Sequence, residues 1–132
     1  MRRKSGKTPI VQKKTTKWYT ERLRQEVAAW PKAVREDVGG QLNKVEYGGE
    51  PDDFKPMPTV GSGVNEIRVA DDGLQYRLIY IAKFEEAVYV LHVITKKKTQ
   101  KTSTHDIQLA KQRYGELVQM RKLQAGAEKK KS

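Results

Sequence analysis

The stretch VNEIRVADDGLQYRLIYIAKFEEAVYVLHVIT, residues 64–95, contains three runs that are rich in β-branched and aromatic residues. Runs of this composition, bounded by turn residues, are typical of β-strands. Asp72-Gly73 and the segment 83–86 supply the two turns between the runs. We therefore predict an antiparallel three-stranded meander over residues 64–70, 75–82 and 86–95.

Helical spacing flanks these strands on both sides. Upstream, apolar residues three and four positions apart predict a helix from Tyr19 to Trp30, and Pro31 opens a second helix. Downstream, Ser103 or Thr104 caps a last helix. The predicted fold class is α+β, with two N-terminal helices packed on a small antiparallel sheet and a C-terminal helix.

Two details of the helical region concern packing and the sheet edge. Gly39 and Gly40 interrupt the apolar stripe of the second helix, each at a cost of roughly 1 kcal/mol relative to alanine. We expect them to allow close packing of this helix on a neighbour. We also consider a short edge strand around residues 17–19.

The charge balance points to the kind of partner. The 132 residues carry a formal net charge of +11, which indicates a polyanionic partner, with a basic surface kept for solubility as the alternative. There is no cysteine, which excludes disulfides and a thiolate metal site, and no carboxylate cluster lies near either histidine. We therefore expect neither a metal nor another cofactor.

Charge and hydropathy divide the chain into three parts. Residues 1–17 contain basic residues and no acid, which predicts a disordered basic arm. Residues 18–121 hold most of the apolar residues and form the predicted domain, and residues 122–132 form a predicted disordered basic tail. No apolar run reaches the roughly 18 residues that span a bilayer, and the N-terminus lacks a secretory signal. We expect a cytoplasmic protein without membrane contact.

Strand alternation predicts which side chains share a face of the sheet. We expect Arg68, Arg77, His92 and Lys96 to approach one patch, with His92 on the same face as Val90. An arginine inside the apolar run YRLIYI is costly to bury unless it has a partner.

This patch allows two interpretations. The structural one is an ion pair between Arg77 and Glu66 on the neighbouring strand. The functional one is a phosphate site, because a guanidinium binds phosphate oxygens with two parallel hydrogen bonds and lysine supplies a point charge.

A phosphate site in a basic protein raises the question of RNA cleavage. RNA carries its own nucleophile, the 2′-hydroxyl beside each phosphate, so a metal-free ribonuclease must move two protons and stabilise the charge at phosphorus. His92 and His105 are candidates for proton transfer, and Arg68, Arg77 and Lys97 for charge stabilisation. The structural alternatives are a core role for His92 and a helix N-terminus for His105.

Further side chains are candidates for RNA contacts around this patch. Lys98 and Lys101 belong to the lysine-rich segment that follows the last predicted strand, and Lys83 lies in the predicted turn before that strand. Tyr76 is a candidate for base stacking, with core packing as its alternative. For the lysines, the alternative is a solvated surface.

The segments EIRV, YRLIY, VYVLHVITKK and DIQLAKQRY, in this order, resemble the RelE/HigB-like toxins of bacterial type II toxin–antitoxin systems, in their phage-related branch. The segment PKAVREDVGGQLNKVEYGGEPDDFKPMP resembles the second helix and proline loop of that branch. The resemblance covers roughly residues 18–120. It implies a RelE-like fold of the microbial RNase type and a toxin that cuts messenger RNA in the ribosomal A site and so inhibits translation.

The resemblance also implies partners and site residues. A cognate antitoxin would neutralise the toxin, often through a protein with a helix-turn-helix domain, and operator DNA would be bound only through it. By position, Arg68 and Arg77 match the basic residues of the family's first two active-site strands, and Lys96 and Lys97 match the basic cluster after the last strand. The alternatives are a non-catalytic RNA- or ribosome-binding module and a degenerate toxin that acts through its antitoxin.

Overall fold

The computed structural model describes residues 12–131, and side chains for residues 12–127. The predicted arm at 1–17 therefore lies largely outside the described residues. The elements follow one another as β1 Thr15–Trp18, α1 Glu21–Ala28, α2 Lys32–Glu46, β2 Phe54–Pro56, β3 Val64–Asp71, β4 Leu74–Ile81, β5 Ala87–Lys97 and α3 Thr104–Lys131.

The five strands form one sheet in the order β1-β5-β4-β3-β2. The meander β3–β4–β5 is antiparallel, as is the pair of β2 and β3, whereas β1 pairs with β5 in parallel. The α+β class and the meander are confirmed. The short edge strand before the helices is present as β1, over residues 15–18 instead of 17–19. The predicted order needs correction because it lacked β2 after the two N-terminal helices, and because the parallel pairing of β1 makes the sheet mixed.

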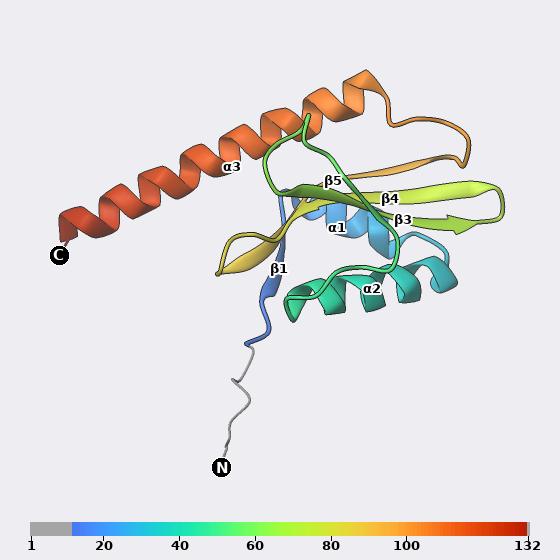
Figure 1. Cartoon of the computed structure of the whole chain (residues 1–132), viewed down its shortest axis with the longest axis horizontal. Coiled ribbons are helices and arrows are strands. Elements are labelled where there is room, and N and C mark those ends of the chain that lie inside the picture. The colour runs from blue at the N-terminus through green and yellow to red at the C-terminus, as the bar shows by residue number, and fades with distance from the viewer. Residues whose placement is uncertain (1–11, 132) are drawn as a thin grey trace, which may run out of the picture.

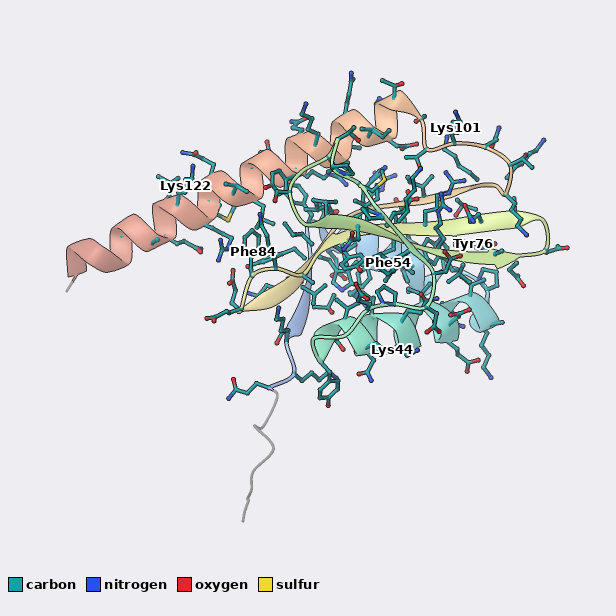
Figure 2. The ribbon with its side chains drawn as sticks, in the orientation of Figure 1. Lys44, Phe54, Tyr76, Phe84, Lys101 and Lys122 are labelled. Atoms are coloured by element: carbon teal, nitrogen blue, oxygen red, sulfur yellow. The ribbon has the colours of Figure 1, made fainter. Side chains whose placement is uncertain are left out.

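The sheet lies between two helical layers. Helices α1 and α2 cover one face, and α3 crosses the other face and extends beyond the sheet towards its C-terminus (Figure 1). Lys44 on α2 and Lys122 on α3 mark these two opposite sides of the molecule (Figure 2). Every residue of β4 from Gln75 to Ile81 is buried, which explains why this strand, apart from Gln75 and Arg77, is apolar in sequence on both of its faces.

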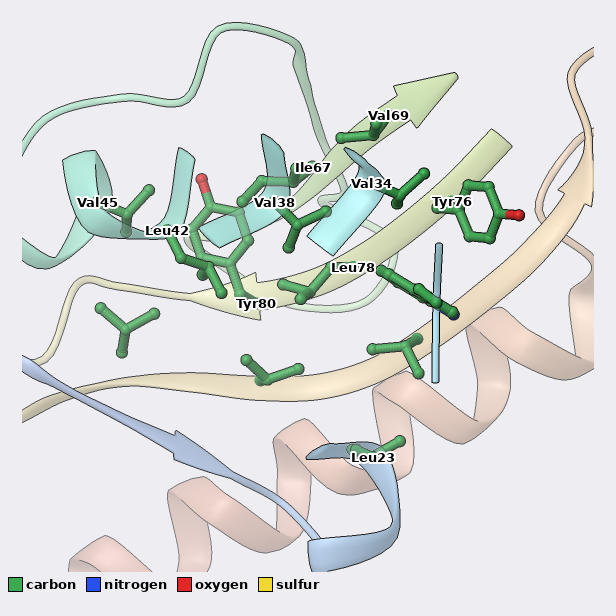
Figure 3. Packing of buried hydrophobic residues seen from close by; sticks show 14 residues of the cluster. Leu23, Val34, Val38, Leu42, Val45, Ile67, Val69, Tyr76, Leu78 and Tyr80 are labelled. Atoms are coloured by element: carbon green, nitrogen blue, oxygen red, sulfur yellow. The ribbon is translucent and has the colours of Figure 1, made fainter. Parts of the chain in front are cut away.

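Each face of the sheet has its own hydrophobic core. The core against α1 and α2 (Figure 3) contains Leu23, Trp30, Val34, Val38, Leu42, Val45, Ile67, Val69, Tyr76, Leu78, Tyr80, Val88, Val90 and Val93. The core on the α3 side contains Met57, Val60, Val64, Ile79, Ile81, Leu91, Ile94, Ala110 and Leu117.

A bulge in β5 changes the predicted alternation. Ile79 pairs with His92 but Tyr80 pairs with Val90, so Leu91 is an extra residue in the ladder. Leu91 belongs to the core on the α3 side, and His92 contacts α3 as well. The prediction that His92 shares a face with Val90 is therefore wrong, because the bulge reverses the alternation between them.

The glycines of α2 do not pack as predicted. Gly39 and Gly40 are exposed, and an added Cβ would meet nothing within 4 Å at either position. Close packing on a neighbour is therefore wrong for both. Gly48, in contrast, has a φ of +89° just after the helix, the left-handed conformation that ends many helices and favours glycine.

Both ends of the predicted domain differ from the structure. Residues 15–17 belong to β1, and the Lys14 backbone N–H donates to the Glu46 carbonyl at 2.8 Å, so this part of the predicted arm is ordered. Helix α3 continues through Lys131 into the predicted disordered tail. Eight of the eleven residues of the tail are lysine, alanine, glutamine or glutamate, which favour helix. In the described residues, no helix combines the length and apolar character needed to cross a bilayer.

Candidate functional site

A cleft of about 730 Å³ opens on the α3 side of the sheet. Its walls come from two segments that are distant in sequence: β2 with the turn after it, and the loop 98–103 between β5 and α3. Its floor comes from β3 and β4. The lining residues are Lys55, Pro56, Met57, Pro58, Thr59, Arg68, Gln75, Arg77, Lys98, Thr99, Gln100, Lys101, Thr102 and Ile107.

Arg77 lies in the floor with only 2% of its surface exposed. Its Nε donates to Gln75 Oε1 at 2.8 Å, its Nη1 donates to Thr102 Oγ1 at 2.9 Å, and its Nη2 donates to the Gln100 carbonyl oxygen. All three nitrogens are therefore engaged. Arg77 holds the loop 98–103 against the sheet, which is a positioning role.

Glu66 lies beneath the cleft and is 1% exposed. One carboxylate oxygen accepts from Arg68 Nε at 3.3 Å, and the other accepts from the Thr102 hydroxyl at 2.9 Å. The predicted ion pair between Arg77 and Glu66 is thus replaced by a pair between Arg68 and Glu66, and Thr102 links this pair to Arg77. A buried carboxylate among these donors stabilises the arginines that form the floor.

The cleft concentrates positive charge. Five cationic side chains line it, and among the described lining residues none is acidic: Lys55, Arg68, Arg77, Lys98 and Lys101. Arg68 is 30% exposed and uses only Nε for Glu66; in the described part of the chain neither of its Nη atoms has a hydrogen-bond partner. Arg68 therefore offers the N–H groups of both Nη atoms to a ligand. Figure 2 shows Lys101 on the loop before α3.

His92 is held between the sheet and α3. Its Nε2 lies 2.9 Å from Asp106 Oδ1, and its Nδ1 lies 3.2 Å from Arg113 Nη1. A guanidinium can only donate, so Nδ1 accepts from Arg113, and the Nε2–H of His92 donates a hydrogen bond to the Asp106 carboxylate. Both ring nitrogens are thus occupied. His92 lies outside the cleft lining, as a link between β5 and α3.

Asp106 connects this link to the start of α3. Burial opposes its ionisation, but hydrogen bonds from His92 and Ser103 and the positive charge of Lys96 outweigh burial, so the pKa of Asp106 is lowered. Lys96 Nζ lies 3.6 Å from Asp106 Oδ2. The Ser103 hydroxyl donates to Asp106 and accepts from its backbone N–H, which identifies Ser103 as the helix cap.

Four other predicted site residues do not line the cleft. Tyr76 packs edge-to-face on Trp30 at 5.2 Å in the core against α1 and α2, on the opposite face of the sheet. Lys83 lies in the β4–β5 turn, 5.8 Å from the centre of the Tyr114 ring. Lys97 and His105 are exposed. Arg68, Arg77, Lys98 and Lys101 are the predicted residues that the structure brings together.

Comparison with known protein families assigns this chain to one of them. The family described as "Phage derived protein Gp49-like (DUF891)" matches residues 25–115, which is more than half of the sequence. The chain belongs to this family. The Gp49-like family is part of the RelE/HigB toxin-like superfamily and is generally associated with the toxins of toxin–antitoxin systems. Searches of curated proteins and of solved structures found no match.

The family match contains every residue that lines the cleft of this Gp49-like protein. It ends inside α3, so the described part of the helix beyond residue 115 lies outside the match, as does β1. In the described residues, no group of three or more histidine, cysteine, aspartate or glutamate side chains is placed to hold a metal ion.

Sequence reasoning missed several cleft residues of the Gp49-like chain. Gln75 shares a face with Arg77 by simple strand alternation, so a signal for it was present. Thr102 comes from a loop and Lys55 from the three-residue strand β2, and the positions of both depend on tertiary contacts that alternation does not describe. Thr102 is placed by Arg77 and Glu66, and Lys55 is placed by the pairing of β2 with β3.

Proposed function

We propose that this Gp49-like protein is the toxin of a type II toxin–antitoxin system, a ribosome-dependent endoribonuclease that cleaves messenger RNA without a metal and thereby inhibits translation. The observation that carries the proposal is a cleft lined by five cationic side chains, of which Arg68 and Arg77 are held on the sheet that forms its floor. Charges held in place before the substrate arrives stabilise a developing negative charge better than mobile ones do.

The residues divide into those that hold the site and those that meet the substrate. Arg77, Glu66 and Thr102 fix the floor and the loop 98–103. Arg68, with its two available Nη atoms, and Lys98 and Lys101 on the loop contact the scissile phosphate and neutralise charge as the 2′-oxygen attacks phosphorus. One of these two lysines, as the free amine, accepts the proton of the 2′-hydroxyl, and the other, as the ammonium, donates a proton to the 5′-oxygen that leaves.

The partners follow from the same proposal. The substrate is messenger RNA in the ribosomal A site, and a cognate antitoxin with a helix-turn-helix domain blocks the cleft and carries the complex to operator DNA. The toxin itself works in the cytoplasm. A basic cleft suits an acidic segment of an antitoxin as well as it suits RNA, because both supply negative charge.

A second candidate function is a non-catalytic RNA- or ribosome-binding module. It is favoured by one observation: among the described residues that line the cleft there is no imidazole or carboxylate to accept the 2′-proton. His92 is engaged on both nitrogens, and His105 lies outside the lining. Cleavage products separate this candidate from the first.

The test is tightly controlled induction of the full chain in bacteria, with mapping of new 5′ ends in ribosome-bound messenger RNA. We expect growth arrest by the wild type. The pair Lys98→Ala with Lys101→Ala should relieve arrest and lower the cleavage rate by about a hundredfold or more, the scale reported for removing groups that stabilise transition-state charge.

The matched control removes two exposed lysines outside the cleft, Lys32→Ala with Lys111→Ala, so that net charge falls equally. This control should arrest growth like the wild type. Arrest without new 5′ ends would favour the binding module, and normal growth with soluble, folded wild type would refute both the nuclease and the toxin.

A further inference from the structure

The net charge of this Gp49-like protein is concentrated at the two ends of its sequence. Residues 1–17 contain seven basic residues and no acid, and residues 118–132 contain five basic residues and one acid, so together they carry +11. Residues 18–117 contain 15 basic and 15 acidic residues and are neutral as a whole. The charge that attracts a polyanion at long range therefore comes from the two ends, although the cleft is built by the neutral segment between them.

The fold brings the described parts of both ends together. Strand β1 lies beside the beginning of β5, where Lys17 and Tyr89 are register partners. The far part of α3 passes the same place, and a second hollow of about 480 Å³ opens there. We call it the terminal pocket, and its charged and polar lining residues are Lys17, Glu86, Tyr89, Arg121, Lys122 and Gln124.

Arg121 fixes α3 to this end of the sheet. Its Nε donates to Glu86 Oε2 at 2.7 Å, and its Nη2 donates to Glu86 Oε1 at 3.1 Å. Its guanidinium lies 3.6 Å from the centre of the Phe84 ring, and the Tyr89 hydroxyl donates to Glu86 at 3.0 Å. The hydrogen bonds from Arg121 lower the pKa of Glu86 to about 2, so this carboxylate is ionised and paired at neutral pH.

Two cations of the terminal pocket are available to a ligand. Lys17 and Lys122 are exposed, and within the described residues neither side chain has an ion-pair or hydrogen-bond partner. Arg121 and Glu86 neutralise each other. Three of the lining residues are basic and one is acidic, so the terminal pocket has a net charge of +2.

The terminal pocket is separate from the cleft of the proposed nuclease. Lys101, which lines the cleft, and Lys122, which lines the terminal pocket, lie towards different ends of α3 (Figure 2). Thr104 and Arg121 are about 25 Å apart along the helix, at roughly 1.5 Å per residue. One phosphate therefore cannot contact both sites. The three cations of the terminal pocket also lie outside residues 25–115, so the family match does not predict this site.

The composition of the terminal pocket indicates a partner that is recognised by charge. Among its described lining residues only Ala125 is aliphatic, and the exposed Met120 and Leu123 of α3 do not belong to the lining. An acidic protein segment or a lipid surface would therefore bury little apolar area here. A phosphate backbone is held by cations and needs no apolar contact.

The same lining favours a double-stranded nucleic acid over a single strand. Proteins that bind single strands stack the unpaired bases on aromatic side chains. Tyr89 is the one aromatic residue among the described lining residues, and it is half-buried, bound to Glu86 and packed edge-to-face on Phe84 at 6.0 Å. It offers no platform for a base, whereas the bases of a duplex are already stacked inside the helix.

We infer that the terminal pocket is a docking surface for the phosphate backbone of double-stranded RNA, with Lys17 and Lys122 as the phosphate contacts. Arg121 and Glu86 hold α3 so that both lysines stay on one surface. The inference goes beyond the proposed function, because docking here involves no cleavage and uses none of the residues that line the cleft.

The test is fluorescence anisotropy of the full chain with a short blunt-ended RNA duplex over a range of salt concentrations. The variant Lys17→Ala with Lys122→Ala removes both contacts and keeps the pair of Arg121 and Glu86. The slope of the logarithm of affinity against the logarithm of salt concentration should become shallower by about 1.8, at roughly 0.9 per phosphate contact on a double helix. Lys17→Arg with Lys122→Arg keeps both charges and should keep the wild-type slope.

Two further pairs remove the same amount of charge elsewhere. Lys32→Ala with Lys111→Ala removes exposed lysines outside both sites, and Lys98→Ala with Lys101→Ala removes the lysines of the cleft. Both pairs should bind the duplex with the wild-type slope. Equal losses in all three alanine pairs, which would reflect net charge alone, or no binding of the duplex by the wild type would overturn the inference.

The other possible partners are distinguished with the same variants. Polyglutamate and vesicles that contain phosphatidylserine replace the duplex as probes. If Lys17→Ala with Lys122→Ala weakens binding to one of these probes and leaves duplex binding unchanged, the surface serves an acidic protein or a lipid and the inference is wrong. Because no RNA is cut in these assays, failure of the proposed nuclease would leave their outcome unaffected.

Discussion

Arg77 and Arg68 face each other across β3 and β4 as register partners, yet their guanidinium groups serve different ends. Arg77 donates from all three nitrogens and is buried, whereas Arg68 donates from Nε alone and is 30% exposed. Arg77 therefore shapes the cleft, and Arg68 is available to a ligand. Two arginines that look equivalent in the sequence should respond differently to the same substitution.

Substitution by lysine separates these roles. Arg77→Lys keeps the charge but loses the fork that reaches Gln75, Thr102 and the Gln100 carbonyl, so we expect the unfolding free energy to fall by about 2–4 kcal/mol. Arg68→Lys should cost less than about 1 kcal/mol, because it replaces one partly exposed ion pair. Urea denaturation followed by circular dichroism measures both, and equal losses would contradict the assigned roles.

The contact between β5 and α3 depends on a small polar cluster rather than on apolar packing alone. His92 on β5 donates to Asp106 on α3, Lys96 lies beside the same carboxylate, and Ser103 caps the helix through it. Arg113 then reaches back to the Leu91 carbonyl at 2.8 Å. These contacts orient α3, and with it Ile107 in the cleft wall.

Acid should weaken this cluster in a defined direction. The folded-state pKa of Asp106 lies below its usual 3.8, so the unfolded state binds the proton more readily. The stabilisation is complete above that usual value and is lost as the pH falls through the lowered folded-state pKa.

We therefore expect Asp106→Asn to reduce the unfolding free energy at pH 6 by about 1–3 kcal/mol. The gap to the wild type should shrink as the pH falls below the usual Asp pKa of 3.8 and through the lowered folded-state pKa of Asp106. Urea denaturation across this pH range measures the gap. Glu86, whose pKa is lowered to about 2 by Arg121, titrates in both proteins, so it cancels in the difference. A gap independent of pH would show that Asp106 acts by packing alone.

Helix α2 contains two glycine positions at which a substitution should raise the stability of the protein. Gly39 and Gly40 are exposed and have space for a methyl group. Gly39→Ala and Gly40→Ala should each raise the unfolding free energy by about 1 kcal/mol, because alanine loses less backbone entropy in a helix. Gly48→Ala should lower it, because its φ of +89° disfavours a side chain. Denaturant titration of the three variants tests this, and destabilisation by either α2 substitution would refute it.

Some features of the strands and helices follow from the local sequence, and others depend on contacts between distant segments. The apolar run of β4 and the turn at Asp72-Gly73 are local signals, and the structure confirms the meander that they predict. The bulge at Leu91 and the parallel pairing of β1 are set by contacts with distant segments, so alternation within β5 gave His92 the wrong face. The predicted close packing at Gly39 and Gly40 was wrong for the opposite reason, because local composition suggested a neighbouring element and the fold places none beside them.

The whole molecule has a sheet buried on both faces, and its cleft lies at one end of the α3 side. This arrangement fixes the cations on a rigid base while the net charge of +11 acts at longer range. Arg68 and Arg77 could be placed in the site from the sequence because strand alternation puts them on the same face. Thr102 and the wall formed by β2 and the turn after it could not, because segments that meet only through tertiary contacts leave no periodic signal.

Binding of single-stranded RNA by the whole protein should fall with salt. The logarithm of the affinity decreases linearly with the logarithm of salt concentration, by about 0.7 per phosphate contact on single strands. The Lys98→Ala and Lys101→Ala double variant should therefore have a slope shallower by about 1.4. The Lys32→Ala and Lys111→Ala double variant should keep the wild-type slope. Fluorescence anisotropy between 50 and 300 mM salt, on the order of the range over which such slopes are measured, gives both values.

The bulge in β5 has a consequence for how this strand can change in length during evolution. Because Ile79 pairs with His92 and Tyr80 with Val90, the ladder does not use Leu91. Deletion of Leu91 would leave the pairs on either side in register. Deletion of a paired residue would instead move the side chains of one part of the strand to the opposite face of the sheet. The one-residue gap would not be silent, since it removes a fully buried side chain and the carbonyl that Arg113 binds. A relative with the shorter strand would have to attach its last helix to the sheet in another way.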